Sequence, residues 1–582
     1  MTLNFAIIGG GLTGTSMLYC LIHKANKAVR RGSMHPSQLK VQVFEKQAEF
    51  GPGLPHSDTQ VMPYHITNMC AEEMSIDQIK PLDFKNWVTH NRDVLRKNLP
   101  HHFESFDSPG VIGRQCTHYP RAIMGAYLKA RFKKAIQTAT KIGLQIDLFP
   151  NSEVIDVREG SGNVHLIVQD SESGTIQSFI SDRILLATGH WFGQTETDRF
   201  FPSPWPAKSL LHNIPPGEHV AVIGSSLSAI EVALTLTSDG NFIRNQSSSL
   251  TYVPSTKPRK LTLYSRKGLL PKVRGKIGEH RNTILTPENL KRLIAKNKGR
   301  LHLDGVFSLL DAELQKVYGR PIDWVDILKP SDTARNYLAR CLREAQDGDG
   351  PEGELLWLTV LHQIIDLARD IYINLTPQER RRFERHYSTV FFSHAATQPT
   401  VNAEKLLALI DGGYVEVIRL GETYRLIKDD TSGEYSFVYK NQQGEKKKDT
   451  YRYVVNARGQ DKSLKSNSSM LAVNLIKSGT VYIDQIPDGV KQEALRKSLP
   501  MDPDGASDQY KTGSVWIDTE THQIMKVSSD GSAIRSDYIY AVGAMTRGQI
   551  IDASMANGSV RSTAAIARIV IDYLTGREET TA

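Results

Sequence analysis

The chain has 582 residues, 40% of them hydrophobic and 23% charged, with a formal net charge of +8. These totals describe an ordinary globular protein that is too long for one core, and the length predicts about three to four domains. No stretch approaches the roughly 18 consecutive apolar residues that span a bilayer. The first strand pattern begins too close to Met1 for a signal peptide, so we expect a cytoplasmic protein with no membrane partner.

Lysine and arginine are spread along the chain, which argues against nucleic acid as a partner. The densest cluster is residues 380–385, which contain four arginines in a helical pattern with glutamates. Because charges of both signs alternate at helical spacing, we expect this cluster to form an exposed helix face.

The four cysteines are widely separated and form no Cys-x-x-Cys pair. This spacing predicts no disulfide framework, no zinc or other metal site and no dithiol redox centre. The cysteines are Cys20, Cys70, Cys116 and Cys341.

The first recognisable motif is an apolar run that leads directly into Gly-x-Gly-x-x-Gly at Gly9, Gly11 and Gly14, followed by a helical pattern. In a dinucleotide-binding fold the first glycine makes the turn, the second admits the pyrophosphate and the third lets helix and strand pack closely. Leu12 and Thr13 then open the helix, whose N-terminal N–H groups face the phosphates. A glycine-rich loop that only begins a buried strand is the alternative, but the strand–turn–helix context favours the dinucleotide site.

A second apolar strand pattern, residues 40–44, ends at Glu45 and Lys46. An acid at this position binds a ribose hydroxyl in dinucleotide folds. The interval from the glycines is longer than the usual 20 or so residues, because a basic segment broken by Gly32 and Pro36 intervenes.

The strand–turn–helix pattern returns at residues 219–231, where an apolar run precedes a second turn. Serine and alanine replace its second and third glycines. The next strand ends in Arg266 and Lys267 instead of an acid, which favours the 2′-phosphate of NADPH over the free ribose of NADH; ordinary surface charge is the alternative. The turn residues are Gly224, Ser225, Ser226, Leu227 and Ser228.

Three further segments, residues 50–69, 119–128 and 265–271, resemble a family of bacterial FAD/NAD(P)-binding proteins. The resemblance implies that Pro55, Asn68 and Met69 line the flavin, although Asn68 could instead cap a helix. His56 stands where that family usually has an aromatic residue. Arg121, near a helix start, could hold a phosphate or an acidic substrate, or could be a surface arginine.

The resemblance also implies roles for residues further along the chain. Val154 is the candidate for an adenine contact, and Gly543 belongs to the strand and helix that close an FAD domain. The usual acid after Gly543 is missing, and Asp552 is the candidate substitute. Ala187, Thr188 and Gly189 resemble the hinge where the chain leaves the FAD domain of related flavoproteins.

We therefore expect an α/β fold with two Rossmann-like domains, the second inserted in the first, plus a mainly helical insertion whose apolar residues recur at helical spacing. The insertion could equally shape a substrate pocket or form a cap or oligomer face. The expected boundaries are 1–214 and 452–582 for FAD binding, 215–275 and 396–451 for NADPH binding, and 276–395 for the helical insertion.

The domain order resembles that of N-hydroxylating flavin monooxygenases, including those that form nitrosuccinate from aspartate. The resemblance implies FAD and NADPH as cofactors, with molecular oxygen as co-substrate and a flavin C4a-hydroperoxide that oxygenates an amino acid or amine. Arg121 and Arg547 are candidate clamps for the carboxylate of a small, acidic substrate. A flavin reductase or oxidase, and a non-catalytic flavin or NADPH sensor, are the alternatives, and a homo-oligomer is left open.

Overall fold

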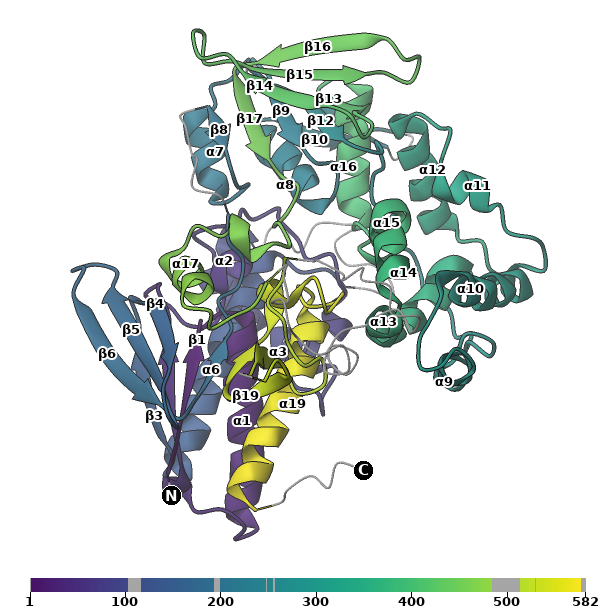
Figure 1. The fold of residues 1–582 in the computed structure, drawn as a ribbon. Coiled ribbons are helices and arrows are strands. Elements are labelled where there is room, and N and C mark those ends of the chain that lie inside the picture. Colours follow the sequence, from purple (N-terminus) through teal and green to yellow (C-terminus); the bar gives the residue numbers. More distant parts are fainter. Residues whose placement is uncertain are drawn as a thin grey trace.

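The structure is a computed structural model that describes residues 2–102, 117–192, 199–246, 249–254, 257–483, 513–528 and 530–576. Two sheet-containing units lie one above the other, and a group of helices flanks them on one side (Figure 1). The first and last parts of the chain together build the lower unit, whereas the middle of the chain builds the upper unit and the helices.

The lower unit is built on a six-stranded sheet in the order β18-β19-β7-β1-β2-β3. Neighbouring strands are parallel except β18, which pairs antiparallel with β19. The apolar run that predicted the first strand is buried at the centre of this sheet. The strands are β1 (Leu3–Ile8), β2 (Leu39–Phe44), β3 (Gln145–Phe149), β7 (Arg183–Leu186), β18 (Gln523–Val527) and β19 (Ala533–Ala541).

Each face of this sheet is covered by a different layer. Three long helices pack on one face, namely α1 (Leu12–Arg30), α6 (Arg121–Lys141) and α19 (Ala556–Leu574). A three-stranded antiparallel meander and α17 (Met470–Lys477) pack on the other, the meander being β4 (Ser152–Glu159), β5 (Val164–Asp170) and β6 (Ile176–Ser181). Short elements join these layers: η1 (Pro36–Gln38), α2 (Gly53–His56), η2 (Ala71–Glu73), α3 (Asp83–His90), α4 (Arg92–Asn98), η4 (Leu464–Ser466) and η5 (Gly543–Thr546).

The upper unit repeats this plan with a five-stranded sheet in the order β13-β12-β9-β17-β8. Strand β9 leads through the second glycine turn into the buried helix α8, and a second antiparallel meander, β14 to β16, precedes β17. Its strands are β8 (Phe200–Phe201), β9 (His219–Ile223), β12 (Lys260–Ser265), β13 (Val415–Arg419) and β17 (Tyr453–Asn456). The other elements are α7 (Ala207–Asn213), α8 (Leu227–Leu236), β10 (Asn241–Arg244), β11 (Leu250–Val253), α16 (Thr400–Asp411), β14 (Arg425–Lys428), β15 (Tyr435–Lys440) and β16 (Lys446–Tyr451).

The predicted helical insertion lies between β12 and α16 and contacts both units. Tyr337 and Leu338 of α12 pack into the core of the upper unit, while α13 is tied to the lower unit by Arg369, as described below. The helices are α9 (Pro287–Lys296), α10 (Leu303–Tyr318), α11 (Trp324–Leu328), α12 (Ala334–Asp347), α13 (Leu356–Asn374), α14 (Pro377–Arg382), the π-helical turn η3 (Phe383–Tyr387) and α15 (Ser388–Ala395).

The two-unit α/β architecture with a helical insertion is thus confirmed, but the predicted boundaries need adjustment. Strand β17 pairs in parallel with β9 and with β8, so both strands belong to the upper sheet. The upper unit therefore uses residues before 215 and after 451, because a strand inside the sheet is fixed by its hydrogen-bonded neighbours and not by its position in the chain.

Two expectations about charge and cysteine are wrong. Arg380 is only 1% exposed, donates from Nη2 to the Ile373 carbonyl at 2.8 Å and lies 4.7 Å over the ring of Tyr372, so the cluster does not form a wholly exposed face. Cys70 is disulfide-bonded; Cys116 lies outside the described residues, whereas Cys20 and Cys341 are buried free thiols.

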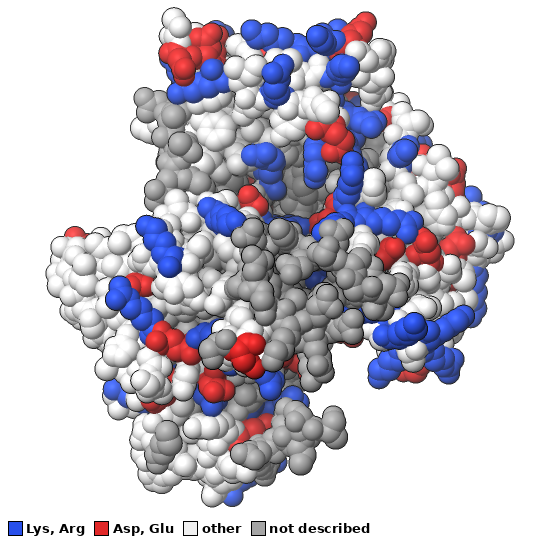
Figure 2. Space-filling view, viewed as in Figure 1, with Lys and Arg blue, Asp and Glu red and all other residues white. Residues whose placement is uncertain are grey.

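The described residues contain neither a membrane-spanning helix nor a cluster of metal-binding side chains. No helix in this part of the chain combines the length and the apolar character that crossing a membrane requires. Nor do three or more His, Cys, Asp or Glu side chains there gather as a metal site would need. Basic and acidic side chains are interspersed over most of the face drawn in Figure 2, with basic side chains gathered near α9 and α10.

Candidate active site

A cavity of about 740 Å³ lies at the carboxyl ends of the lower sheet's strands and extends toward the helical insertion. This volume falls within the range of about 300–1,000 Å³ that is usual for ligand sites. Fifteen of the residues that the sequence singled out line it: Gly9, Gly11, Leu12, Thr13, Glu45, Lys46, Pro55, Asn68, Met69, Arg121, Ala187, Thr188, Gly189, Gly543 and Arg547.

Two helices open onto this cavity with their N-terminal ends. Helix α1 begins after Gly11, and α19 begins after Met555, which lines the cavity together with Ala556 and Asn557. The first N–H groups of a helix have no partner within the helix and carry partial positive charge. The N-terminus of α1 and the N-terminus of α19 can therefore each bind an anionic group such as a phosphate.

The glycine turn has the geometry that its sequence predicted. Gly9 has φ +104°, and a Cβ at this position would lie 2.3 Å from the Ala187 carbonyl oxygen, so the turn excludes a side chain. A Cβ at Gly14 would lie 1.9 Å from the Gly9 carbonyl oxygen. Gly14 does not line the cavity; it keeps α1 close to the strand, which is the packing role expected for the third glycine.

Glu45 lies where the fold places a ribose-binding acid. Its Oε2 accepts a hydrogen bond from the Gly10 N–H at 2.7 Å, and its Oε1 accepts one from the Gln47 N–H at 3.0 Å. Burial raises the pKa of this carboxyl, while the two backbone donors oppose that shift. The side chain is thus held against the glycine turn, facing the cavity that its neighbours line.

The residues present fit a bound FAD. Gly11 and Gly53 both line the cavity, and a Cβ added at Gly11 would lie only 3.3 Å from the Cα of Gly53. Because Gly11 has no side chain, this narrow space stays open and a ligand can approach the backbone closely. His56, also in the wall, is buried, and its Nδ1 has no hydrogen-bond partner within the described structure. Two helix ends for phosphate, an acid for ribose and an orphaned polar atom are the features that a dinucleotide would satisfy.

Arg121 is committed to a protein partner as well as lining the cavity. Its Nε donates to Oε1 of Glu231 on α8 at 2.6 Å, and both side chains are largely buried. Next to this pair, His65 Nε2 and Thr235 Oγ1, also on α8, are 2.9 Å apart. These contacts join the lower unit to helix α8 of the upper unit, so Arg121 has a structural role in addition to its predicted role as a clamp.

Arg547 reaches the cavity from η5 and the segment that follows it. Its Nη1 donates to the Gln460 carbonyl at 3.2 Å, and the Gln460 side-chain oxygen lies 2.9 Å from Nδ1 of His190. Burial lowers the pKa of the Arg547 guanidinium. Arg547 is half-buried, and Glu384 and Asp461 oppose this shift. A partly desolvated cation is further stabilised by an anion, which is the property expected of a carboxylate clamp.

Two predicted cofactor contacts lie elsewhere. Val154 is buried in β4 and does not line the cavity. Asp552 is 3% exposed, and its Oδ1 accepts a hydrogen bond from Nε of Arg369 on α13 at 2.9 Å. In the structure the aspartate balances a buried arginine that docks the helical insertion on the lower unit. Its role as a substitute for the missing acid after Gly543 stays a prediction.

Glu73, Arg274 and His362 line the cavity without having been predicted from the sequence. Arg274 Nη2 donates to Oε1 of Glu73 at 2.5 Å, and His362 Nδ1 lies 3.7 Å from the same oxygen. The three residues come from η2, from the loop after β12 and from α13. No local pattern marks them, because the fold alone brings these segments together.

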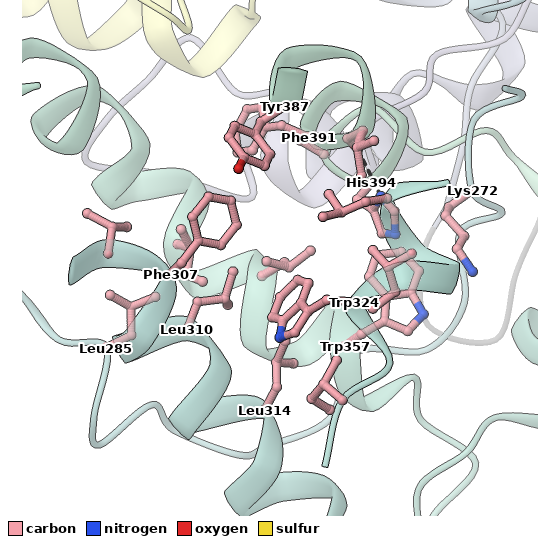
Figure 3. Close-up of a pocket in the computed structure, with 18 of the residues that line it drawn as sticks. Lys272, Leu285, Phe307, Leu310, Leu314, Trp324, Trp357, Tyr387, Phe391 and His394 are labelled. Atoms are coloured by element: carbon pink, nitrogen blue, oxygen red, sulfur yellow. Dashed lines mark hydrogen bonds between the residues drawn. The ribbon is translucent and has the colours of Figure 1, made fainter. Parts of the chain in front are cut away.

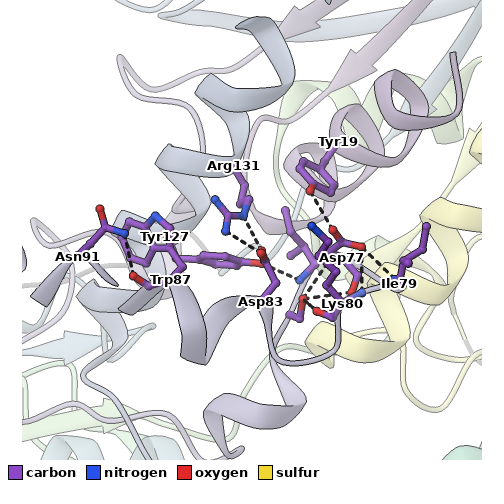
Figure 4. A network of polar contacts seen from close by, with 11 residues as sticks. Tyr19, Asp77, Ile79, Lys80, Asp83, Trp87, Asn91, Tyr127 and Arg131 are labelled. Atoms are coloured by element: carbon purple, nitrogen blue, oxygen red, sulfur yellow. Dashed lines mark hydrogen bonds and ion pairs between the residues drawn. The ribbon is translucent and has the colours of Figure 1, made fainter. Parts of the chain in front are cut away.

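The wall that carries Glu73 is fixed by a polar network shown in Figure 4. Arg131 makes two hydrogen bonds to Asp83, at 2.5 and 2.8 Å, and the Tyr127 hydroxyl donates to the same carboxylate at 2.9 Å. On the neighbouring side, the Tyr19 hydroxyl donates to Asp77 at 3.0 Å. The segment between these carboxylates is thereby held against α1 and α6.

The second glycine turn lies outside this cavity, at the carboxyl end of the upper sheet. Gly224 has φ +128°, and the Ser225 hydroxyl donates to the Leu269 carbonyl at 2.6 Å. Lys267 Nζ donates to the His386 carbonyl at 2.8 Å, so this lysine connects the end of β12 to the helical insertion. Burial lowers the pKa of Lys267. Arg266 is exposed at the same strand end.

Comparison with known proteins agrees with the class of fold. Residues 6–191 match the sequence model of a family described as FAD-NAD(P)-binding. The N-terminal part of the lower unit is therefore an FAD/NAD(P)-binding domain, as predicted.

Three particular proteins are similar to this chain. The uncharacterised protein YdhS of Escherichia coli strain K12 is 25% identical over 450 residues, which cover 73% of this chain and 78% of YdhS. The ornithine N-hydroxylase of Kutzneria sp. 744 is 12% identical, with a TM-score of 0.47 and coverage of 98% and 100%. The ornithine hydroxylase of Pseudomonas aeruginosa is also 12% identical, with a TM-score of 0.46 and coverage of 99% and 100%.

Buried histidines predict how stability depends on pH. Burial lowers the pKa of His56 and His522 to about 3, and that of His65, His118 and His394 to about 4. Because an unfolded histidine titrates near 6.5, the unfolded chain binds more protons between these values. The contribution of these histidines to the free energy of unfolding is therefore fully present above about pH 6.5. The free energy of unfolding falls as the pH drops toward 4, by up to about 1.4 kcal/mol per pH unit for each histidine.

The measurement is the urea midpoint between pH 7 and 4.5. The variant His118→Gln should show a shallower pH dependence than His212→Gln, which alters an exposed histidine. Equal slopes in these two variants would contradict the assignment.

Proposed function

We propose that the protein is an FAD- and NADPH-dependent monooxygenase that oxygenates the nitrogen of an amine or amino acid. The observation that carries this proposal is the cavity itself: it combines the first dinucleotide motif with residues of the helical insertion and of the loop after β12, such as His362 and Arg274. The described part of its lining contains no cysteine. In this proposal the electrons pass from the flavin to oxygen, which enters the cavity as a diffusible acceptor.

FAD, when bound, would supply the redox chemistry with NADPH as reductant and oxygen as acceptor, while the protein supplies binding, orientation and exclusion of water. In this proposal Gly11, Leu12 and Thr13 receive the pyrophosphate and Glu45 the ribose. Arg547 holds the carboxylate of an amino-acid substrate. Arg121, already paired with Glu231, keeps the two units in register over the cavity.

The proposal is tested by measuring NADPH consumption and product mass for the FAD-loaded protein with a panel of amines and amino acids. NADPH oxidation that one substrate stimulates, with a mass gain of one or more oxygen atoms, is the expected result. Oxidation that yields only peroxide whatever is added would replace the proposal with a reductase or oxidase. Bound flavin with no NADPH oxidation would replace it with a sensor.

Cofactor choice gives a separate prediction. Arg266 is exposed at the end of β12, where a 2′-phosphate binds in NADP-dependent folds, whereas Lys267 is occupied by the His386 carbonyl. We expect Arg266→Ala to raise the KM for NADPH about tenfold or more and to leave that for NADH unchanged, since a charged hydrogen bond contributes about 1.5–3 kcal/mol. Lys260→Ala, at the opposite end of the same strand, is the matched control; equal effects on both cofactors would contradict the assignment.

A further inference from the structure

A second cavity, of about 450 Å³, lies inside the helical insertion. Figure 3 shows rings and aliphatic side chains from α10, α11, α13 and α15 surrounding an open space. Phe307 and Leu310 form one wall, and Trp324, Trp357 and Phe391 lie around the rest. Sequence periodicity predicted a helical insertion with apolar residues such as Leu310 and Leu314 at helical spacing, yet the side chains around this cavity do not fill the space between them.

Most charged side chains of this second cavity already have partners within the protein. Lys272 Nζ donates to Glu344 at 3.1 Å, Arg340 pairs with Asp326 at 3.4 Å, and the Tyr318 hydroxyl donates to Asp349 at 2.7 Å. Asp323 caps its own helix, and Arg320 lies over the Tyr318 ring.

His394, the histidine in this lining, has its pKa lowered to about 4 by burial and is neutral at pH 7. Away from the exposed Arg320, an ionic ligand would have to break one of these pairs, because burying an uncompensated charge is costly. The lining therefore suits an uncharged apolar group.

The second cavity is adjacent to the candidate active site and shares part of its wall. Ile365 of α13, Ala395 at the end of α15 and Ile551 of the lower unit line both cavities. All three side chains are hydrocarbon, so the wall that the two cavities share is apolar. Ile551 is held there because its neighbour Asp552 is bonded to Arg369.

We propose that the second cavity holds the hydrocarbon body of the substrate, an alkyl or acyl chain whose reactive nitrogen lies in the active-site cavity. This inference rests on the proposed function for the identity of the reacting end. An elongated chain is the shape that would extend from one cavity into its neighbour across the apolar wall that they share. One water occupies about 30 Å³ of liquid, so the second cavity has room for about ten or more non-hydrogen atoms. The acidic amino acid predicted from the sequence would leave this volume unused.

The test measures binding without turnover, using linear 1-alkanols of four to ten carbons as uncharged probes and the FAD-loaded protein without NADPH. Binding is followed by tryptophan fluorescence, because Trp324 and Trp357 line the pocket, and by the flavin absorbance. We expect the Kd to fall about fourfold for each added methylene until the pocket is full. We also expect the longer probes to perturb the flavin absorbance.

Two variants of α10 connect this response to the pocket. Leu310→Trp fills the space and should weaken octanol binding at least tenfold, whereas Ser308→Trp, which places the same ring on the exposed face of α10, should not. Leu310→Ala enlarges the pocket, so the alkanol that binds most tightly should be longer by one or more carbons. This variant keeps the test valid if Leu310→Trp fails to fold.

The outcomes separate the two proposals. A Kd that is independent of chain length, or equal in Leu310→Trp and Ser308→Trp, would overturn the pocket assignment even if the protein oxygenates small amines. Binding that depends on chain length but leaves the flavin absorbance unchanged would overturn its connection to the active site. Chain-dependent binding with a flavin response, but no NADPH-dependent oxygenation of an alkylamine, would uphold the pocket and remove the proposed function.

Discussion

The variant Gly11→Val is expected to purify folded but without flavin. Gly11 has φ −71°, a conformation open to any residue, so valine should not strain the backbone. Its side chain, however, would project toward Gly53, where even a Cβ would lie 3.3 Å from the Cα, and would occupy the space in which a pyrophosphate meets the N-terminus of α1. Loss of hydrogen bonds to a charged group lowers affinity by at least about tenfold, and the measurement is the flavin content of the purified protein together with its circular dichroism.

The upper unit supplies a matched control, because Ser226 occupies the position equivalent to Gly11 in the second turn. Ser226→Val adds the same bulk and should weaken NADPH binding while the protein keeps its flavin. Gly11→Ser should keep more flavin than Gly11→Val, since serine is tolerated at the equivalent position. A Gly11→Val protein with full flavin occupancy would show that FAD does not bind at the first glycine turn.

Much of the fold could be predicted because its determinants are local. The run from Leu3 to Ile8, the turn at Gly9 and helix α1 are adjacent in the chain, and each follows from hydrophobic period and glycine chemistry. The same local pattern at residues 219–231 predicted the second unit. The change from short alternating segments to three- and four-residue spacing predicted the helical insertion.

The contacts that organise the cavity could not be predicted in this way, because they join distant segments. Arg121 and Glu231 are 110 residues apart, Arg369 and Asp552 are 183 apart, and Glu73 and Arg274 are 201 apart. Hydrophobic periodicity reports which face of an element is buried, but not which element it meets.

Arg369 did offer one clue, since a single arginine interrupts the apolar positions of α13. A buried charge requires a partner of opposite sign. The sequence could thus indicate that Arg369 has an acidic partner, whereas only the fold identifies that partner as Asp552.

This pair gives the second large effect: Asp552→Asn is expected to destabilise the protein by about 3–5 kcal/mol, since it leaves the buried Arg369 cation uncompensated. Arg369 is 6% exposed and also donates from Nη2 to the Gly558 carbonyl at 3.0 Å and to the Ser562 hydroxyl at 3.1 Å, so it cannot easily move into solvent. The measurement is the urea-induced transition of the variant, and the FAD dissociation constant is measured in parallel. Because Asp552 does not line the active-site cavity, flavin affinity should change by less than stability.

The exposed pair Arg335–Asp411, whose side chains are 50% and 46% exposed, provides the control for the loss of an ion pair. Asp411→Asn should cost no more than about 1 kcal/mol, because solvent screens such a pair. In the double variant Arg369→Leu/Asp552→Leu both charges are gone, and stability should recover substantially toward that of the original protein. Loss of flavin from Asp552→Asn without loss of stability would restore the aspartate to the cofactor site. The expected pattern, in which stability falls and flavin remains, would establish Arg369 and Asp552 as the link that holds the helical insertion, and Ile551 with it, at the boundary between the two cavities.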